Sequence, residues 1–315
     1  DAEAKLQKQY ITDNPNLTGK KHLLDVSPDG SSYAAAHQKY HPWLREFMTE
    51  RDYYDIFLFD TQGNLVYTVF KEADYATNLL SGKWRETDLK RAFQSAMNNA
   101  AGQASFFDFK PYAPSNGAPA SFISMAVKGA DGKAIGVLAF QMPIARINTI
   151  MQIADGMGNS GETYLVGRDF LMRSDSRFSK ESTILSTKVE SVSVKHALAG
   201  GTGIDQITDY RGIPVVSAYT PLDFMGQRWA VIAEIDQSEI FAPLRDLLIA
   251  IALSAAIVIT IVAAIGILVG RSISKPITAM TTNMSEVAAG NFQAQIDGLN
   301  RGDEIGDMAK ALLVF

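Results

Sequence analysis

A run of 24 residues without a charged side chain, from Leu247 to Gly270, limits the possible folds of this chain more than any other stretch. An α-helix needs about 20 apolar residues to cross the hydrocarbon core of a bilayer. The run therefore predicts a transmembrane helix over residues 247–270, with the lipid bilayer as a partner. Arg271 and Lys275 follow it closely, and this excess of cations places the C-terminal side in the cytoplasm. The long part before the run then lies outside the cytoplasm.

Both ends of the sequence indicate a piece of a longer protein. The chain begins with Asp1 and carries no signal peptide, although the part before Leu247 has to be exported. We expect a first membrane helix upstream of Asp1. The last residues, through Phe315, follow a helical pattern without a capping residue or a terminating glycine, so we also expect further chain after Phe315.

The composition excludes several classes of protein. With 47% hydrophobic residues and a net charge of −5, the chain is not intrinsically disordered and has no basic stripe for a nucleic acid. The absence of cysteine excludes disulfides, thiolate metal sites and cysteine nucleophiles. No glycine-rich phosphate loop or metalloprotease motif is present. We therefore expect no enzymatic activity in this part, no cofactor and no nucleic-acid partner.

The four histidines do not form a recognisable catalytic or metal site. His37 and His41 are spaced to share one helical face, which could hold a metal ion. No third ligand accompanies them, and Pro42 follows directly. We interpret them as a packed or solvated pair and expect no bound metal.

The exported part repeats one order of predicted elements. Residues 54–70 form a hairpin pattern with a turn at Asp60–Asn64, followed by a long connection, three more strands and a helix. Residues 161–176 begin the same order again, with a turn near Gly167. The repeat predicts an α+β fold with two tandem antiparallel sheets of about five strands each, covered by helices and loops.

A long helical region precedes the first sheet. Leu6, Tyr10 and Ile11 have helical spacing, which Asn14-Pro15 interrupts, and residues 33–48 form a second helical stretch with Pro42 as a kink or break. We expect this region to run beside both sheets.

The last 45 residues predict a helix, a connector and a second helix. Apolar residues at spacings of three and four form a narrow seam in the first helix; they are Ile273, Ile277, Met280, Met284 and Val287. The second helix begins at Asp303. Such short seams bury little in one chain, which predicts a four-helix bundle with a second copy.

These motifs resemble known families. Residues 271–315 resemble a HAMP domain, with Pro276 in the first helix, Gly290-Asn291-Phe292 opening the connector, and Asp-Glu-Ile-Gly from Asp303. The tandem sheets resemble the double Cache sensor, two PAS-like modules stacked on a long N-terminal helix, through residues 54–79 and 161–178. The whole chain is similar to a bacterial methyl-accepting chemotaxis protein truncated at both ends.

The resemblance implies an architecture and a function. It divides the chain into an N-terminal helical region, a distal Cache module, a membrane-proximal Cache module, the transmembrane helix and the HAMP domain; the ranges are 1–50, 51–155, 156–243, 247–270 and 271–315. It implies a homodimeric transmembrane chemoreceptor in the inner membrane, with a periplasmic sensor and a cytoplasmic HAMP domain. Pro276, Gly290 and Glu304 would relay the signal. A region after Phe315 would hold a chemotaxis histidine kinase and an adaptor.

The resemblance also places a ligand site. In PAS-like sheets a small ligand lies between the sheet and the segment that joins strands two and three, here residues 71–102. Aromatic walls with a few charged groups suit an amino acid, an organic acid or an amine. The candidate residues in the distal module are Tyr67, Lys71, Tyr75, Trp84, Arg85, Asp108, Lys110, Tyr112 and Ser124.

Two sequence motifs of the receptor family are not used to assign ligand residues in this chain. Amino-acid receptors carry a tyrosine, arginine, tryptophan or tyrosine, and aspartate signature, whereas Lys83-Trp84-Arg85 has similar residue types in another order. Arg173-Ser174-Asp175 occurs in such receptors whatever their ligand, so we interpret it as structural.

Two other functions remain open. A histidine kinase or nucleotide cyclase after Phe315 would use the same sensor, and the sequence beyond that residue would decide. A binding module anchored by one helix would not need the regular seam after Arg271.

Overall fold

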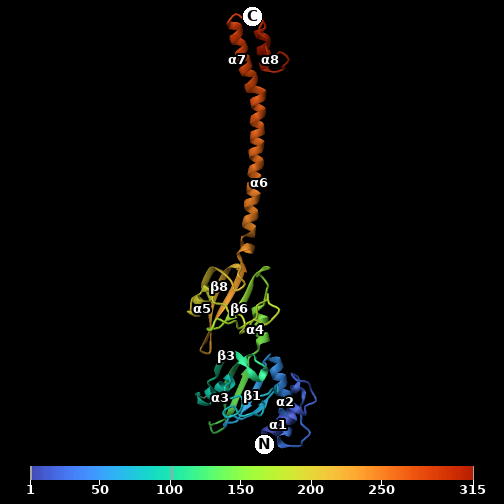
Figure 1. Cartoon of the computed structure of the whole chain (residues 1–315), viewed down its shortest axis with the longest axis vertical. Helices are drawn as coiled ribbons and strands as arrows, with labels where there is room; N and C mark the ends of the chain where they lie inside the picture. Colours follow the sequence, from blue (N-terminus) through green and yellow to red (C-terminus); the bar gives the residue numbers. More distant parts are fainter. Residues whose placement is uncertain (1, 101, 315) are drawn as a thin grey trace. The chain divides into compact units, whose positions relative to one another are not determined.

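The computed structural model describes residues 2–100 and 102–314 (Figure 1). It divides into two compact units, one ending at Ile240 and the other beginning at Phe241.

The N-terminal region of the first unit consists of separate helices. Helix α1 (Ala2–Gln7) continues as a π-helical turn, η1 (Lys8–Thr12), and a short 3-10 helix, η2 (Lys21–Leu23), follows. The chain leaves η1 at Asn14, whose side-chain amide donates to the carbonyl oxygens of Tyr10 and Lys21 at 2.9 and 3.0 Å. The predicted interruption is therefore confirmed.

Helix α2 (Ser32–Glu50) begins where the Ser31 hydroxyl accepts the N–H of Ala34, and it runs unbroken past Pro42. The predicted second helix is confirmed. The long leading helix is thus two helices, and α2 packs on the distal sheet.

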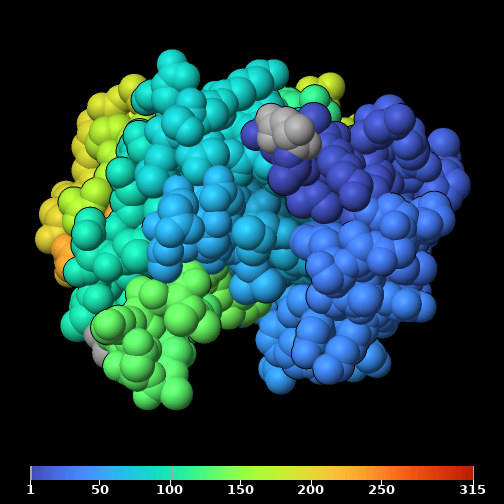
Figure 2. Space-filling view, turned by 90° about the horizontal axis from the view of Figure 1, so that it is seen from below, coloured from blue at the N-terminus to red at the C-terminus, as the bar shows by residue number. Residues whose placement is uncertain are grey.

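The distal sheet contains five antiparallel strands in the order β2-β1-β5-β4-β3. Their bounds are β1 (Asp55–Phe59), β2 (Leu65–Thr68), β3 (Ser105–Tyr112), β4 (Ala118–Lys128) and β5 (Ala134–Gln141). Helix α3 (Asp88–Asn98) covers one face, where Phe57, Phe93 and Phe122 are buried, and α2 covers the other. A 3-10 turn, η3 (Ala113–Ser115), joins β3 to β4. Figure 2 shows the N-terminal region in blue beside this module.

The proximal sheet contains four antiparallel strands in the order β6-β9-β8-β7. Its elements are α4 (Ile144–Met151), β6 (Glu162–Val166), α5 (Val192–Leu198), β7 (Gly203–Thr208), β8 (Pro214–Phe224) and β9 (Gln227–Asp236). The return strand of the predicted hairpin is reduced to isolated bridges such as Val166–Met172. The Ser174 hydroxyl accepts the Leu165 N–H in place of a backbone carbonyl, so the ladder ends there.

A shared apolar cluster joins the two sheets of the first unit. Phe106 and Phe109 of β3 pack with Leu165 of β6 and Trp229 of β9, and residues of α4 surround them. Burying one such side chain contributes about 1.5–3 kcal/mol, so this cluster ties the distal sheet to the strand that leads into the next helix.

The second unit is helical. Helix α6 (Gln237–Val269) continues through a π-helical turn, η4 (Gly270–Ser274), into α7 (Lys275–Ala288). This continuous helix is long and apolar enough to cross a membrane, and its most apolar stretch has no buried side chains. It contains the predicted span over residues 247–270.

Helix α8 (Glu304–Leu312) contacts α7, and Met280 of α7 and Ala309 of α8 are buried. The Asp303 carboxylate caps it by accepting the N–H of Gly306 at 3.1 Å. Pro276 is the second residue of α7, Gly290 has a positive φ of 91° after that helix, and Glu304 opens α8. Much of the predicted seam stays half exposed in one chain, at Ile273, Ile277 and Met284.

Gly306 and Gly302 give a matched test of this helix pair. A Cβ at Gly306 would lie 2.2 Å from the carbonyl oxygen of Arg301, whereas a Cβ at Gly302 would meet nothing within 4 Å. Gly306→Ala should destabilise the helix pair by about 1–3 kcal/mol and expose the connector to protease. Limited proteolysis of the full chain in detergent measures this. Gly302→Ala should behave as wild type, and equal cleavage of all three proteins would contradict the packing.

Candidate ligand-binding site

Lys71, in the turn that follows the end of β2 at Thr68, lies at the centre of the candidate site. Its side chain is only 3% exposed, and its backbone has a positive φ of 62°, a conformation that is uncommon outside glycine. The Thr68 hydroxyl holds this turn by accepting the Lys71 N–H at 2.8 Å. The ammonium Nζ lies 4.3 Å from the ring centre of Tyr67, 5.0 Å from that of Tyr75 and 5.8 Å from that of Tyr10. These three rings form an aromatic cage around a buried cation.

The buried Lys71 ammonium is not fully compensated by a negative charge. Burial lowers the pKa of Lys71 to about 7, against the attraction of the Asp55 carboxylate. Asp55 is itself fully buried, and burial raises its pKa. Its Oδ1 accepts the N–H groups of Ile56, Val69 and Phe70, which fixes the carboxylate to the sheet. An anionic group bound near Nζ would favour the charged lysine.

Histidines and tyrosines surround the cage with fixed hydrogen bonds. The Tyr75 hydroxyl donates to that of Tyr33 at 2.8 Å, and His41 Nδ1 lies 2.6 Å from the Tyr67 hydroxyl. The rings of His37 and His41 stack with their centres 4.2 Å apart. Burial lowers the pKa of His37 to about 4, so this ring is neutral near pH 7. Of the two expected alternatives, packed or solvated, the pair is packed.

A cavity of about 440 Å³ opens beside Lys71. Its lining comes from the N-terminal segment, the segment after β2 and the turn after β3; the residues are Ile11, Thr18, Gly19, Lys21, Tyr54, Phe70, Lys71, Glu72, Ala73, Pro114, Ser115 and Asn116. The Glu72 carboxylate accepts from the hydroxyls of Tyr54 and Ser115, and burial raises its pKa. Lys71 and Glu72 therefore both line the cavity, while the Lys71 ammonium itself lies in the cage and donates to the carbonyl oxygen of Thr68.

Four of the nine predicted ligand residues lie in or beside this region. Tyr67, Lys71 and Tyr75 form the cage, and the Tyr112 hydroxyl donates to Asp74 at 2.6 Å. Burial raises the pKa of Asp74 to about 7.

Four others lie apart from the cage. Trp84 packs on the core beneath α3 and donates to the Ala73 carbonyl oxygen. Arg85 and Lys110 are exposed and pair with Glu86 and Asp88. The remaining residue, Ser124, donates to the carbonyl oxygen of Ala92 at 2.8 Å.

Asp108 contacts the proximal module instead of the cavity. Its carboxylate accepts from Nε and Nη2 of Arg173, both at 3.0 Å. Arg173 is 3% exposed and also donates to Asp169 at 2.9 Å. This geometry supports the structural interpretation of Arg173 and removes Asp108 from the ligand candidates.

Sequence reasoning missed Tyr10, Tyr33 and Glu72. The two tyrosines lie in helical segments far from Lys71 in sequence, and no local pattern links them to it. Glu72 directly follows Lys71, which the sequence identifies as a candidate ligand residue. This adjacency within the connecting segment could have added Glu72 to the candidates.

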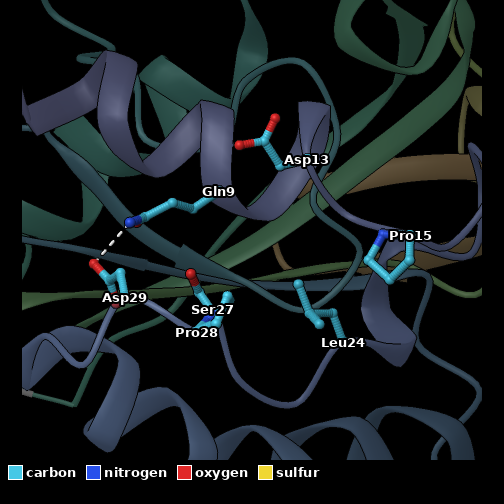
Figure 3. A pocket seen from close by; sticks show the side chains of 7 residues that line it. All are labelled: Gln9, Asp13, Pro15, Leu24, Ser27, Pro28 and Asp29. Atoms are coloured by element: carbon cyan, nitrogen blue, oxygen red, sulfur yellow. Dashed lines mark hydrogen bonds between the residues drawn. The ribbon is translucent and has the colours of Figure 1, made fainter.

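A second cavity of about 490 Å³ lies within the N-terminal segment (Figure 3). Gln9 and Asp29 face each other across it, with the Gln9 amide donating to the carboxylate at 2.7 Å. Asp13 supplies a second carboxylate, and the lining residues include no cation. This cavity is less suited to an acidic ligand than the one at Lys71.

Comparisons with known proteins agree with this architecture. The family model described as Cache domain matches residues 7–244, and that described as HAMP domain matches residues 268–315. The probable chemoreceptor y4sI of Sinorhizobium fredii is 26% identical over 298 residues, which cover 94% of this chain and 37% of that protein. The chain thus spans little more than a third of this relative's length.

Two solved sensor domains are also similar. The periplasmic sensory domain of the Campylobacter jejuni chemoreceptor Tlp1 is 12% identical with a TM-score of 0.46, covering 77% of this chain and 94% of that one. The ligand-binding domain of the Pseudomonas aeruginosa PAO1 amino acid chemoreceptor PctB, in complex with L-Arg, is 17% identical with a TM-score of 0.45; the coverages are 76% and 91%.

The neutral His37 predicts an acid-sensitive fold. Its pKa is about 4 in the fold and about 6.5 in an unfolded chain. Between these values the unfolded chain binds more protons, so stability falls as the pH drops through this window, by about 1–3 kcal/mol. Thermal unfolding of the full chain measures the loss, which His37→Asn should reduce because asparagine can still donate to the Asp25 carbonyl oxygen.

The wild-type chain, measured over the same pH range, is the reference. An acid slope in His37→Asn as steep as in wild type would show that His37 is not held neutral.

Proposed function

This chain belongs to the Cache-domain family, and on that premise we propose that it is the sensing, membrane and relay part of a transmembrane chemoreceptor. The sensor binds a small molecule outside the cytoplasm, in the periplasm, and the membrane helix carries the signal across the inner membrane to the HAMP domain. The complete protein works as a homodimer and controls a chemotaxis histidine kinase and its adaptor through a region beyond Phe315. This chain acts as a receptor and not as an enzyme.

One observation carries the ligand assignment: the buried Lys71 and the Glu72 carboxyl group line the same cavity. Lys71 supplies a donor for a carboxylate, and Glu72 supplies an acceptor for an ammonium. The cavity of about 440 Å³ suits a small ligand and not a peptide. The ligand is therefore an amino acid or another small organic acid.

The relay runs through contacts that join the two sheets. A ligand at Lys71 lies near the end of β3, and the same strand carries Asp108 and Phe109 into the junction with Arg173 and Trp229. Strand β9 continues directly into α6. The Glu239 carboxylate fixes the first turn of α6 by accepting the N–H groups of Asn159 and Ser160. A shift of the distal sheet thus moves the start of the membrane helix, and the bundle responds by changing its packing.

Lys71→Met tests the ligand site. In thermal unfolding of the full chain, wild type should gain stability with at least one compound from a panel of amino acids, organic acids and amines. The stabilising compounds should carry a carboxylate. Lys71→Met should lose this gain, because methionine fills the cage without an ammonium.

Lys110→Met is the matched control, since Lys110 is exposed and pairs with Asp88 away from the cage. It should respond as wild type does. Stabilisation by amines alone, or an undiminished response in Lys71→Met, would refute this ligand site.

Disulfide cross-linking between two copies can measure the signal that α6 transmits. Because the chain has no cysteine, a single introduced cysteine is its only thiol. Met284→Cys places one thiol in the seam of α7, and the stabilising ligand should change its rate of cross-linking between two copies in membranes. A flexible glycine-rich insertion after Pro243 should abolish this change while the ligand still raises the melting temperature.

The same insertion in the exposed turn at Gly132 should leave the response intact, since that turn has open space around it. If the Pro243 insertion leaves the cross-linking response unchanged, α6 does not act as the relay.

A further inference from the structure

The N-terminal segment contributes a second lysine to the cavity beside Lys71. Lys21, the first residue of η2, lines this cavity together with Glu72 of the segment after β2. The Lys71 ammonium lies in the aromatic cage, and Lys21 is the other cation among the lining residues. The cavity thus lies between two segments that carry opposite charges, with Lys21 on one and Glu72 on the other.

The Lys21 ammonium has hydrogen-bond donors to spare. Its Nζ donates to the carbonyl oxygen of Asn14 at 3.0 Å, and the Asn14 amide donates back to the carbonyl oxygen of Lys21 at 3.0 Å. These two bonds close a loop of residues 14–21. The Asn14 carbonyl oxygen is the only partner of this ammonium in the described part of the chain. Because an ammonium has three donors, two remain free for an anion.

Contacts with two other elements hold Lys21 in place. The carbonyl oxygen of the next residue, His22, lies 2.7 Å from Nε2 of His41 and accepts from Nη1 of Arg45 at 2.8 Å, so α2 fixes η2. The His22 ring stacks on Phe70 with the ring centres 5.0 Å apart, and Phe70 also lines the cavity. Lys21 therefore needs little reordering when a ligand binds, which favours affinity.

Glu72 is positioned to contact a different group of the same molecule. The hydroxyls of Tyr54 and Ser115 donate to its two oxygen atoms, and all three residues line the cavity. No cation pairs with Glu72 among the described residues. Each carboxylate oxygen has two lone pairs, so Glu72 can accept a further hydrogen bond from a ligand.

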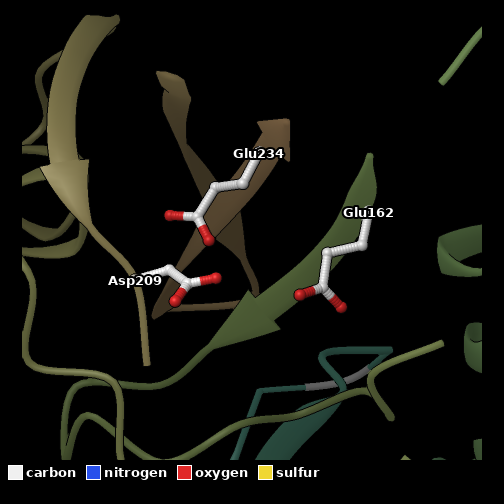
Figure 4. A group of neighbouring side chains, drawn as sticks. All are labelled: Glu162, Asp209 and Glu234. Carbon is white, nitrogen blue, oxygen red and sulfur yellow. The ribbon is translucent and has the colours of Figure 1, made fainter. Parts of the chain in front are cut away.

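The acidic residues of the proximal module are engaged differently. Glu162, Asp209 and Glu234 lie close together (Figure 4), where Arg211 pairs with Asp209 at 2.6 Å and neighbouring hydroxyls donate to both glutamates. These carboxyl groups have partners within their own module, whereas Glu72 faces a cavity without a cationic partner. The distal cavity is therefore the better place for a ligand with a positive group.

We propose that Lys21 binds the carboxylate of the ligand while Glu72 accepts a hydrogen bond from a donor group on the same molecule. This inference rests on the proposed function, since it concerns the same cavity. The pair selects molecules that carry both a carboxylate and an ammonium or hydroxyl group, over simple acids and simple amines. A bound molecule joins the loop of residues 14–21 to the segment after β2 and thereby orders that loop.

Thermal unfolding and titration of the full chain in detergent test the assignment. The probes are the common amino acids, each beside the acid that lacks its amino group and the amine that lacks its carboxylate. The molecule with both groups should stabilise wild type most. Lys21→Gln, which keeps a side-chain donor without the charge, should weaken binding of that amino acid about 10- to 100-fold, as expected for a lost hydrogen bond to a charged group.

Two further lysine variants are the controls. Lys21→Arg keeps the cation and should retain most of the affinity. Lys20→Gln alters an exposed neighbour that does not line the cavity, and it should bind as wild type does.

Hydrogen exchange separates a contact with the ligand from a structural role of Lys21. Without a probe, residues 14–21 should exchange alike in wild type and Lys21→Gln, because the Asn14 amide still closes the loop. The stabilising amino acid should slow this exchange in wild type and leave it unchanged in Lys21→Gln at the same concentration. Faster exchange of the unliganded loop in Lys21→Gln, with undiminished slowing by the amino acid, would show that Lys21 is only structural.

The outcomes distinguish this inference from the proposed function. Equal affinity of wild type and Lys21→Gln for the same amino acid would overturn the role of Lys21 and leave the receptor function standing. Equal stabilisation by an amino acid and by the acid without its amino group would overturn the role of Glu72. Stabilisation of wild type by none of the carboxylate compounds would refute the ligand site itself.

Discussion

The ion pair between Arg173 and Asp108 is the contact on which the arrangement of the first unit depends. A guanidinium that is 3% exposed requires a fixed partner, and its partner carboxylate lies on the distal sheet, 65 residues away. Leaving such a charge unpaired costs about 3–5 kcal/mol. The apolar cluster around Phe109 and Trp229 surrounds the same junction. The two modules therefore share one buried ion pair and one apolar cluster, so a movement of one module displaces the other.

Both modules concentrate buried polar groups where strands end. The distal module places Lys71 after β2 with Asp55 at the start of β1, and the proximal module places Glu162 and Glu234 on paired strands. Each unsatisfied buried polar atom costs about 1–3 kcal/mol. A ligand that satisfied such atoms in the distal module would recover that free energy on binding, which is the physical basis of the proposed ligand site.

Predictions from sequence succeeded where the deciding interactions are local. The Cache and HAMP resemblances and the α+β fold are confirmed. The break at Asn14 and the start of α8 at Asp303 depend on partners within a few residues. The proximal hairpin was predicted as two strands, because its alternating pattern continues past the turn. The structure replaces the second strand with isolated bridges, since the Ser174 side chain competes with the backbone for Leu165.

The sequence by itself determined the long apolar helix, the order of the elements and part of the candidate ligand site. Tyr67, Lys71 and Tyr75 could be grouped because they lie within one short segment. Only the tertiary structure decided that Tyr10 completes their cage and that the Asp108 carboxylate pairs with Arg173. Helical and strand patterns report which face of an element is apolar, because that property repeats along the chain. They carry no information about which distant polar group meets which, because that depends on how the faces pack together.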